Sequence, residues 1–131
     1  MKALYGFLAV GAGGAIGSML RYAVTILTVE RLGPGFPWHT LAINVTGSFL
    51  IGVVAIYAQS SVGWSPYVGT FLVVGVLGGF TTFSTFSYDA VTLFADGAPQ
   101  LALAYCAGSV LFGIVAAVAG MAVARLALRL A

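Results

Sequence analysis

The sequence predicts an all-α integral membrane protein, with one domain over residues 1–131 and four transmembrane helices. Only 6% of the residues are charged, 61% are hydrophobic, and the mean hydropathy is +1.10. A soluble domain carries about a quarter charged residues, so this chain could not cover itself in water. Four apolar stretches, at about residues 3–29, 38–58, 67–95 and 100–128, each exceed the roughly 20 residues that a spanning helix needs. The connectors, at residues 31–37, 59–66 and 96–99, are too short for a soluble domain and contain turn-forming glycine, proline and serine.

The first apolar stretch is interpreted as a retained helix with one polar face. It is longer than the apolar core of a typical secretory signal, and it contains Arg21. Small and polar residues recur at steps of three and four, which places them on one side of a helix: Gly14, Gly17, Ser18, Arg21 and Thr25. Arg21 either reaches the nearby membrane surface along its own aliphatic stem or has a functional role, and the sequence leaves both open.

The second stretch repeats this pattern and adds an amide deep in the span. Thr40, Asn44, Gly47, Ser48 and Gly52 share one helical face, as expected for close helix packing. An unpaired amide in a membrane interior costs about 1–3 kcal/mol or more. Asn44 therefore either bonds across a helix seam or faces a water-filled path, and both interpretations stay open.

The third stretch contains the run Gly-Gly-Phe-Thr-Thr-Phe-Ser-Thr-Phe-Ser, from Gly78 to Ser87. Glycine costs about 1 kcal/mol against alanine in a helix, and β-branched and aromatic residues lose rotamer freedom there. We therefore predict that this helix is broken near the middle of the membrane. In lipid, such a break must be buried or line a cavity, where hydroxyls such as those of Thr81 and Thr82 help to satisfy the backbone.

A break at this depth provides groups that bind ions. Freed carbonyls offer oxygen ligands to a cation, and the start of the second half-helix attracts an anion. The rings of Phe80, Phe83 and Phe86 recur every three residues, so on one continuous helix they would form a stripe about 120° wide. Because ring edges carry positive charge, a ring edge turned toward a pore could meet an anion. For Phe80 we favour plain core packing.

The fourth stretch places Tyr105, Ser109, Gly113 and Gly120 along one side, at steps of four and seven, and such glycines are expected to allow close helix packing. The third stretch carries Asp89 near its end, where its carboxylate is expected to face a watery vestibule. Cys106 is the single cysteine of the chain, cannot form an internal disulfide, and is interpreted as a small buried residue.

Charge at the helix ends gives little direction to membrane insertion. With four spans, Lys2, Arg125 and Arg129 lie on one side of the membrane, and Arg31 lies on the other with Arg21 nearby. The difference is about one or two positive charges, too small to fix an orientation by the positive-inside rule. A chain without a bias could insert both ways round, although a small bias sometimes suffices.

The third-stretch run, following Asn44 and Arg21 and preceding Tyr105 and Ser109, resembles the fluoride channel family (Fluc, also called CrcB). The resemblance extends over essentially the whole chain. It implies homodimers whose two subunits insert antiparallel into the cell (inner) membrane of a prokaryote. It also implies two fluoride pathways at the dimer interface, through which fluoride leaves the cytoplasm passively.

The resemblance also implies roles for individual residues. The carbonyls of Gly78 and Thr81 from both subunits would hold a structural sodium ion, and Asp89 would be the acidic vestibule residue, where the family more commonly has glutamate. One departure is Gly113, because the family's hydroxyl track often continues at that position. The residues expected on the fluoride pathway are Asn44, Thr82, Phe83, Phe86, Tyr105, Ser109 and Arg21.

The chemistry of fluoride fits this pattern, and three other function classes fit it less well. Fluoride is tightly hydrated, so a pathway needs donors that replace water, and a fixed bare cation in its wall would hinder exit. A small dual-topology exporter of organic cations needs an intramembrane carboxylate, for which only the off-centre Asp89 is a candidate. A scaffold bundle without transport leaves the Phe83/Phe86 pattern without a purpose. No Ser/His/Asp set or metal-ligand cluster points to an enzyme, and the expected partners are fluoride, lipid and a second subunit, not nucleic acid.

Overall fold

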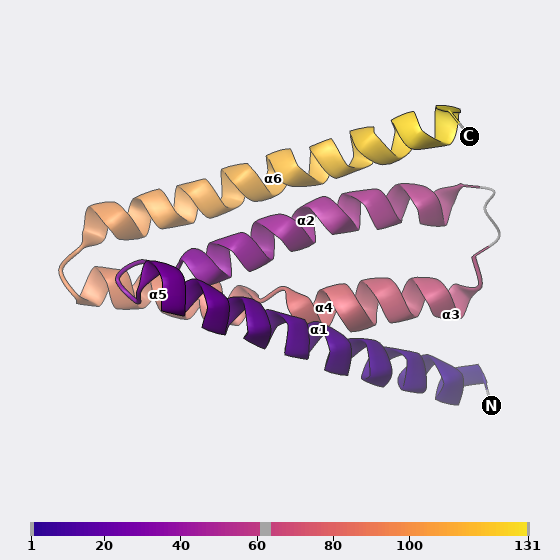
Figure 1. Ribbon diagram of the computed structural model, residues 1–131, viewed down its shortest axis with the longest axis horizontal. Helices are drawn as coiled ribbons and strands as arrows, with labels where there is room; N and C mark the ends of the chain where they lie inside the picture. The colour runs from indigo at the N-terminus through magenta and orange to yellow at the C-terminus, as the bar shows by residue number, and fades with distance from the viewer. Residues whose placement is uncertain (1, 61–63, 131) are drawn as a thin grey trace.

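The structure is a computed structural model that describes residues 2–60 and 64–130 (Figure 1). Residues 61–63 of the second predicted connector, and residues 1 and 131 of the predicted domain, lie outside the described residues. The described chain is helical and contains no strand. Its elements are α1 (Lys2–Leu32), α2 (Trp38–Gln59), α3 (Pro66–Gly69), η1 (Thr70–Leu77), α4 (Gly78–Phe80), α5 (Phe83–Ala95) and α6 (Pro99–Leu130).

Four helical segments are long and apolar enough to cross a membrane, which confirms the predicted number of spans. They are Lys2–Leu32, Trp38–Gln59, Pro66–Ala95 and Pro99–Leu130. Each begins or ends within a few residues of the predicted bounds. The third segment combines α3, η1, α4 and α5, while each of the others is one continuous helix.

The third segment is broken near its middle, as the sequence predicted. Thr81 and Thr82 leave the helical conformation, with φ/ψ of −77°/157° and −151°/117°. The break lies after the glycine pair, because Gly78 is itself helical at φ −64° and ψ −37°. It also separates Phe80 from Phe83, so the three rings do not form the continuous stripe that their spacing suggested. Phe80 is buried at 8% exposure, in agreement with core packing, whereas Phe83 is 79% exposed.

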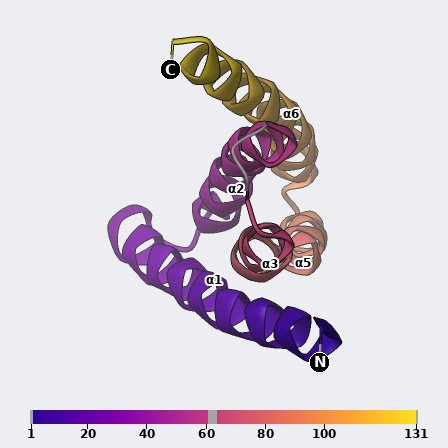
Figure 2. The same cartoon turned by 90° about the vertical axis from the view of Figure 1, so that its right-hand side faces the viewer.

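The helices form two closely packed pairs. α2 packs along α6, and α1 packs against η1 and α4, with α5 contacting α6. Figures 1 and 2 show α1 tilted against the other helices, on the side of the broken segment away from α6. Both chain termini lie at one end of the bundle, and the α1–α2 and α5–α6 connections lie at the other (Figure 1).

Glycines allow the backbones of both pairs to touch. A Cβ on Gly17 would collide with the backbone oxygen of Val76 in η1, and a Cβ on Gly120 would collide with that of Phe49 in α2. Close approach of this kind is how membrane helices gain van der Waals contact. The glycine faces predicted for the first and fourth stretches therefore belong to helix packing at these two positions.

Candidate functional site

The break in the third segment is held open by one side chain from α2. Asn44 Nδ2 donates to the carbonyl oxygen of Thr82 at 3.1 Å, and the backbone N–H of Thr82 donates to Asn44 Oδ1 at 2.9 Å. A backbone N–H only donates and a carbonyl only accepts, so this pair of bonds fixes which way the Asn44 amide points. The amide thus replaces the helical partners that Thr82 loses.

Thr82 also begins the second half-helix. It is the N-cap of α5, and its Oγ1 accepts from the N–H of Thr85 at 3.2 Å. The same hydroxyl donates to Thr85 Oγ1 at 3.0 Å and lies 3.2 Å from Ser84 Oγ. Because a hydroxyl has one proton, the proton of Thr82 is used within this cluster.

Before the break, the backbone leaves a carbonyl without its helical donor. The N–H and the hydroxyl of Thr81 both donate to the oxygen of Leu77, at 2.9 and 2.8 Å. The next amide, that of Thr82, turns to Asn44 instead of closing a turn onto the oxygen of Gly78. Gly78 is exposed, and the extended conformation of Thr81 directs its carbonyl away from the helical ladder. The end of α4 therefore offers oxygen ligands at the surface of the chain.

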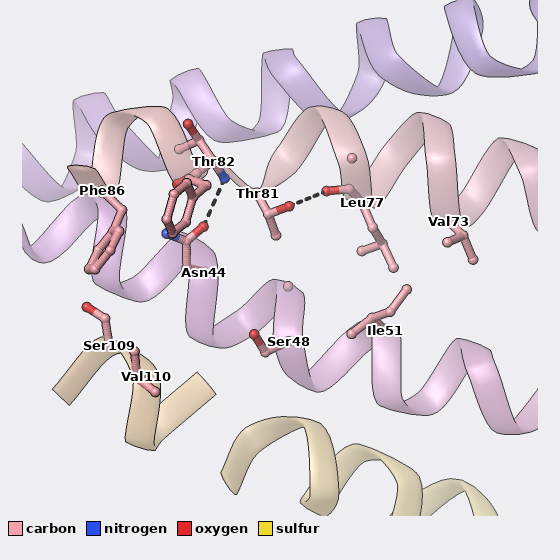
Figure 3. Close-up of a pocket in the computed structure, with 13 residues that line it drawn as sticks. Asn44, Ser48, Ile51, Val73, Leu77, Thr81, Thr82, Phe86, Ser109 and Val110 are labelled. Carbon is pink, nitrogen blue, oxygen red and sulfur yellow. Dashed lines mark hydrogen bonds between the residues drawn. The ribbon is translucent and has the colours of Figure 1, made fainter. Parts of the chain in front are cut away.

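A cavity of about 410 Å³ lies beside this break, between α2, the third segment and α6 (Figure 3). It brings together seven of the predicted site residues: Asn44, Gly78, Thr81, Thr82, Phe83, Phe86 and Ser109. It is also lined by residues to which the sequence assigned no role in ion binding: Gly47, Ser48, Ile51, Val73, Leu77 and Val110. Of these, Ser48 is the polar one, and its position four residues after Asn44 was the available signal.

Aromatic rings and an unpaired hydroxyl form one wall of the cavity. The rings of Phe83 and Phe86 lie 5.5 Å apart between centroids and are inclined at 39°. Ser109 Oγ is buried and has no hydrogen-bond partner within the described residues. Figure 3 shows this oxygen pointing toward Phe86. A buried hydroxyl without a partner is costly, so the position favours a bound water or anion.

Asp89 and Tyr105 form a separate cluster next to the cavity. Asp89 Oδ2 accepts from Thr40 Oγ1 at 2.6 Å and from the Tyr105 hydroxyl at 3.3 Å. Thr40 is fully buried, and Tyr105 is 1% exposed. Phe86 connects the two places, because its ring lies 5.3 Å from that of Tyr105. The predicted residues Asp89 and Tyr105 therefore do not line the cavity of Asn44 and Ser109.

Arg21 lines a second cavity, of about 330 Å³, between α1, α2 and α5. His39, Thr40 and Thr85 are also on its wall, and Thr82 lines both cavities. The structure thus places Arg21 on the far side of Thr82 from Ser109. Arg21 therefore lies outside the cavity at the break, as Asp89 and Tyr105 do, and Thr82 lines both this second cavity and the one at the break.

Four helices that are long and apolar enough to span a membrane, one of them broken beside a cavity lined by an amide and several hydroxyls, define a multi-pass membrane protein of the kind that handles small solutes or ions. The chain belongs to the CrcB family: the family described as "CrcB-like protein, Camphor Resistance (CrcB)" matches residues 8–121. This match confirms the resemblance that the sequence motifs indicated.

Several curated relatives are similar to almost the whole chain. A protein of Rhizobium meliloti (strain 1021), named Fluoride-specific ion channel FluC, is 52% identical over 118 residues, which cover 90% of this chain and 94% of the relative. A protein of the same name from Agrobacterium fabrum is 49% identical over 116 residues, 88% of this chain and 93% of the relative. Another, from Nitrobacter winogradskyi, is 52% identical over 120 residues, 90% of this chain and 94% of the relative.

Proposed function

We propose that this protein is a fluoride-selective ion channel that lets fluoride leave the cytoplasm passively. The observation that carries the proposal is the cavity at the helix break, which gathers an amide, an unpartnered hydroxyl and two phenylalanine rings. The name that the relatives share, fluoride-specific ion channel, supports the choice of ion. A channel has no catalytic step, and we expect no enzymatic activity.

The cavity offers donors that replace the water around fluoride. Asn44 Nδ2 carries two N–H groups, and one of them bonds to Thr82, which leaves the other for a ligand in the cavity. Ser109 Oγ has its proton available, and the positive edges of Phe83 and Phe86 add weak attraction for an anion. Donors from three separate elements thus surround one space.

The wall of this cavity suits passage better than tight binding. None of the residues that line it is charged, although Arg21 is available in the second cavity beyond Thr82. Conduction requires that an ion enter readily and also leave, so neutral donors favour throughput where a bare cation would trap the ion. We propose that Arg21 and Asp89 act outside this space, Arg21 by attracting anions and Asp89 in the vestibule with Tyr105.

We further propose that two subunits assemble antiparallel in the inner membrane and form two such pathways, with a structural sodium ion between them. The donor set fits sodium, because half-helix ends and unwound carbonyls are typical ligands of this ion. Gly78 and Thr81 supply such carbonyls at the exposed side of the break. The described residues contain no group of three or more His, Cys, Asp or Glu side chains, so carbonyl ligation is the chemistry they offer. Sodium would contribute a fixed positive charge that joins the two subunits.

A small dual-topology exporter of organic cations remains the alternative, and the structure gives it less support. Such a protein needs a carboxylate that meets the substrate. Asp89 is instead bonded to Thr40 and Tyr105, and it lines neither the cavity at the break nor the one beside Arg21.

Fluoride efflux from proteoliposomes, followed with a fluoride electrode, tests the proposal. We expect fast efflux of fluoride and none of chloride. Phe83→Ile and Phe86→Ile should slow it by about tenfold or more, the effect of losing about 1.4 kcal/mol of stabilisation. Phe94→Ile is the matched control, because Phe94 lies on the same helix, is 66% exposed and does not line the cavity. Absence of fluoride efflux from folded parent protein would disprove the channel.

A further inference from the structure

We infer that Ser48 provides a second anion-binding position in the cavity, one helical turn beyond Asn44 and Ser109, and that Gly113 leaves the space for it. This inference rests on the proposed fluoride channel and assigns Ser48 as a further residue that touches the ion. The ligand class is a small, hard anion that accepts hydrogen bonds from neutral hydroxyls.

The packing of α2 against α6 places these residues at two levels along the helices. Asn44 and Ser109 form the first level, and Ser48 and Gly113 form the second, one helical turn later. A Cβ on Gly52 would meet the backbone of Ala117, and a Cβ on Gly113 would lie 3.4 Å from Ser48 Oγ. The contact between Ser48 and Gly113 lies four residues before the contact between Gly52 and Ala117 on both helices, so α2 and α6 keep the same register over this stretch. One turn earlier, the same register sets Asn44 opposite Ser109. The first level therefore has a donor on each helix, and the second level has Ser48 facing a glycine.

The hydroxyl of Ser48 is not engaged as helical hydroxyls in this protein often are. Thr25, Thr70 and Ser87 each donate to the carbonyl four residues earlier, at 3.0 Å. That bond satisfies the proton of a hydroxyl inside a helix. Ser48 makes no hydrogen bond within the described residues, and it lines the cavity. Asn44 and Ser48 both line this cavity and lie one helical turn apart on α2.

Gly113 determines which helix supplies the donor at the second level. A Cβ at this position would lie 3.4 Å from Ser48 Oγ, so a longer side chain there would crowd this hydroxyl. With glycine there, an anion that leaves Asn44 and Ser109 meets the Ser48 hydroxyl after about 5.4 Å, the rise of one helical turn. A succession of weak sites at such spacing is what conduction requires.

Fluoride efflux from proteoliposomes of four variants tests the inference. We expect Ser48→Ala to slow efflux by about tenfold, as the loss of a hydrogen bond to a charged ligand implies. Thr46→Ala, which removes an exposed hydroxyl from the same helix, should conduct like the parent. In the Ser48→Ala background, Gly113→Ser should restore efflux because it returns a hydroxyl to the second level. Gly113→Ala in that background adds the same bulk without a hydroxyl and should not.

The outcomes separate this inference from the function on which it rests. A parent that moves no fluoride overturns both. A parent that moves fluoride, with Ser48→Ala equally fast, overturns the inference and leaves the channel standing. Equal restoration by Gly113→Ala and Gly113→Ser also overturns it, because packing and not a hydroxyl would then be the requirement. Thermal unfolding of the purified variants accompanies each rate, and restoration by the serine alone supports the inference even if Ser48→Ala lowers the unfolding temperature.

Discussion

At the scale of single residues, Asn44 bonds across a helix seam, which is one of the two alternatives that the sequence left open. Its amide bonds both backbone groups of Thr82, and the residue also lines the cavity. The residue type and depth predicted a polar contact, because an unpaired amide in lipid is costly. Sequence could not identify Thr82 as the partner, since the pairing depends on how α2 meets the break.

We predict that Asn44→Ala destabilises the folded subunit by about 2 kcal/mol or more, because a buried donor and a buried acceptor of Thr82 both lose their partner. Asn44→Asp should destabilise it as well, because a carboxylate still accepts from the Thr82 N–H but turns an oxygen toward the Thr82 carbonyl, where Asn44 donates. Unfolding in detergent, followed by circular dichroism during a denaturant titration, measures both. Unfolding of Asn44→Ala at the same denaturant concentration as the Thr46→Ala control would refute this role.

Other site residues show how far residue-level prediction reached. Asn44, Phe83, Phe86 and Ser109 were predicted to lie on one pathway, and all four line one cavity. Tyr105 was predicted with them, and it lies instead beside Asp89, buried at 1% exposure. Its four-residue step from Ser109 gives the helical face but not the depth of the side chain, which depends on the packing of Thr40 and Asp89.

At the scale of elements, the third segment was predictable as a broken helix, but its detailed course was not. Composition identified a weak stretch from Gly78 to Ser87, and the break falls inside it. The exact point depends on a tertiary bond, because Thr82 is drawn out of the helix by Asn44. The π-helical η1 was not predicted at all. Apart from Thr70 its residues are apolar on every side, so no periodicity distinguishes π from α geometry.

The α2–α6 pair gives a test at the same scale. We predict that Gly120→Ala destabilises the protein by about 1–3 kcal/mol, because the added methyl group collides with the backbone of Phe49 and forces the helices apart. Gly108→Ala is the control on the same helix, where a Cβ would be in ordinary contact with the Phe112 ring at 3.6 Å. Alanine favours helix over glycine, so this control should be neutral or slightly stabilising.

Thermal unfolding in detergent compares the two substitutions. The separation of α2 from α6 should also widen the space between Ser48 and Gly113, so we expect altered fluoride efflux in Gly120→Ala only. Equal unfolding temperatures for the two variants would show that close backbone contact at Gly120 does not hold this pair together.

At the scale of the whole molecule, the two ends of the bundle differ by only one or two positive side chains, according to whether Arg21 is counted with the end that carries Arg31. The end with both termini carries Lys2, Arg125 and Arg129, and the other end carries Arg31 beside Glu30 (Figure 1). Acidic residues contribute little to insertion, so Arg31 retains its effect on orientation. Sequence sufficed to count these charges, and the structure adds that they lie at opposite ends of one bundle. Orientation and assembly stay predictions, to be tested in the membrane.

We predict that the chain inserts in both orientations and that fluoride efflux needs both. Arg125→Gln with Arg129→Gln should bias the termini toward the outside, and Arg31→Gln should bias them toward the inside. A cysteine at exposed Asp96, with Cys106 replaced by serine, reports orientation through labelling of intact cells by an impermeant maleimide. The parent should label partially. The variant with Arg125→Gln and Arg129→Gln should label less, and the Arg31→Gln variant should label more.

Fluoride resistance of cells should fall with either biased variant alone and return when both are expressed together, because only the mixture supplies antiparallel pairs. Full resistance from a variant that inserts in one orientation would refute antiparallel assembly while leaving the fluoride channel intact.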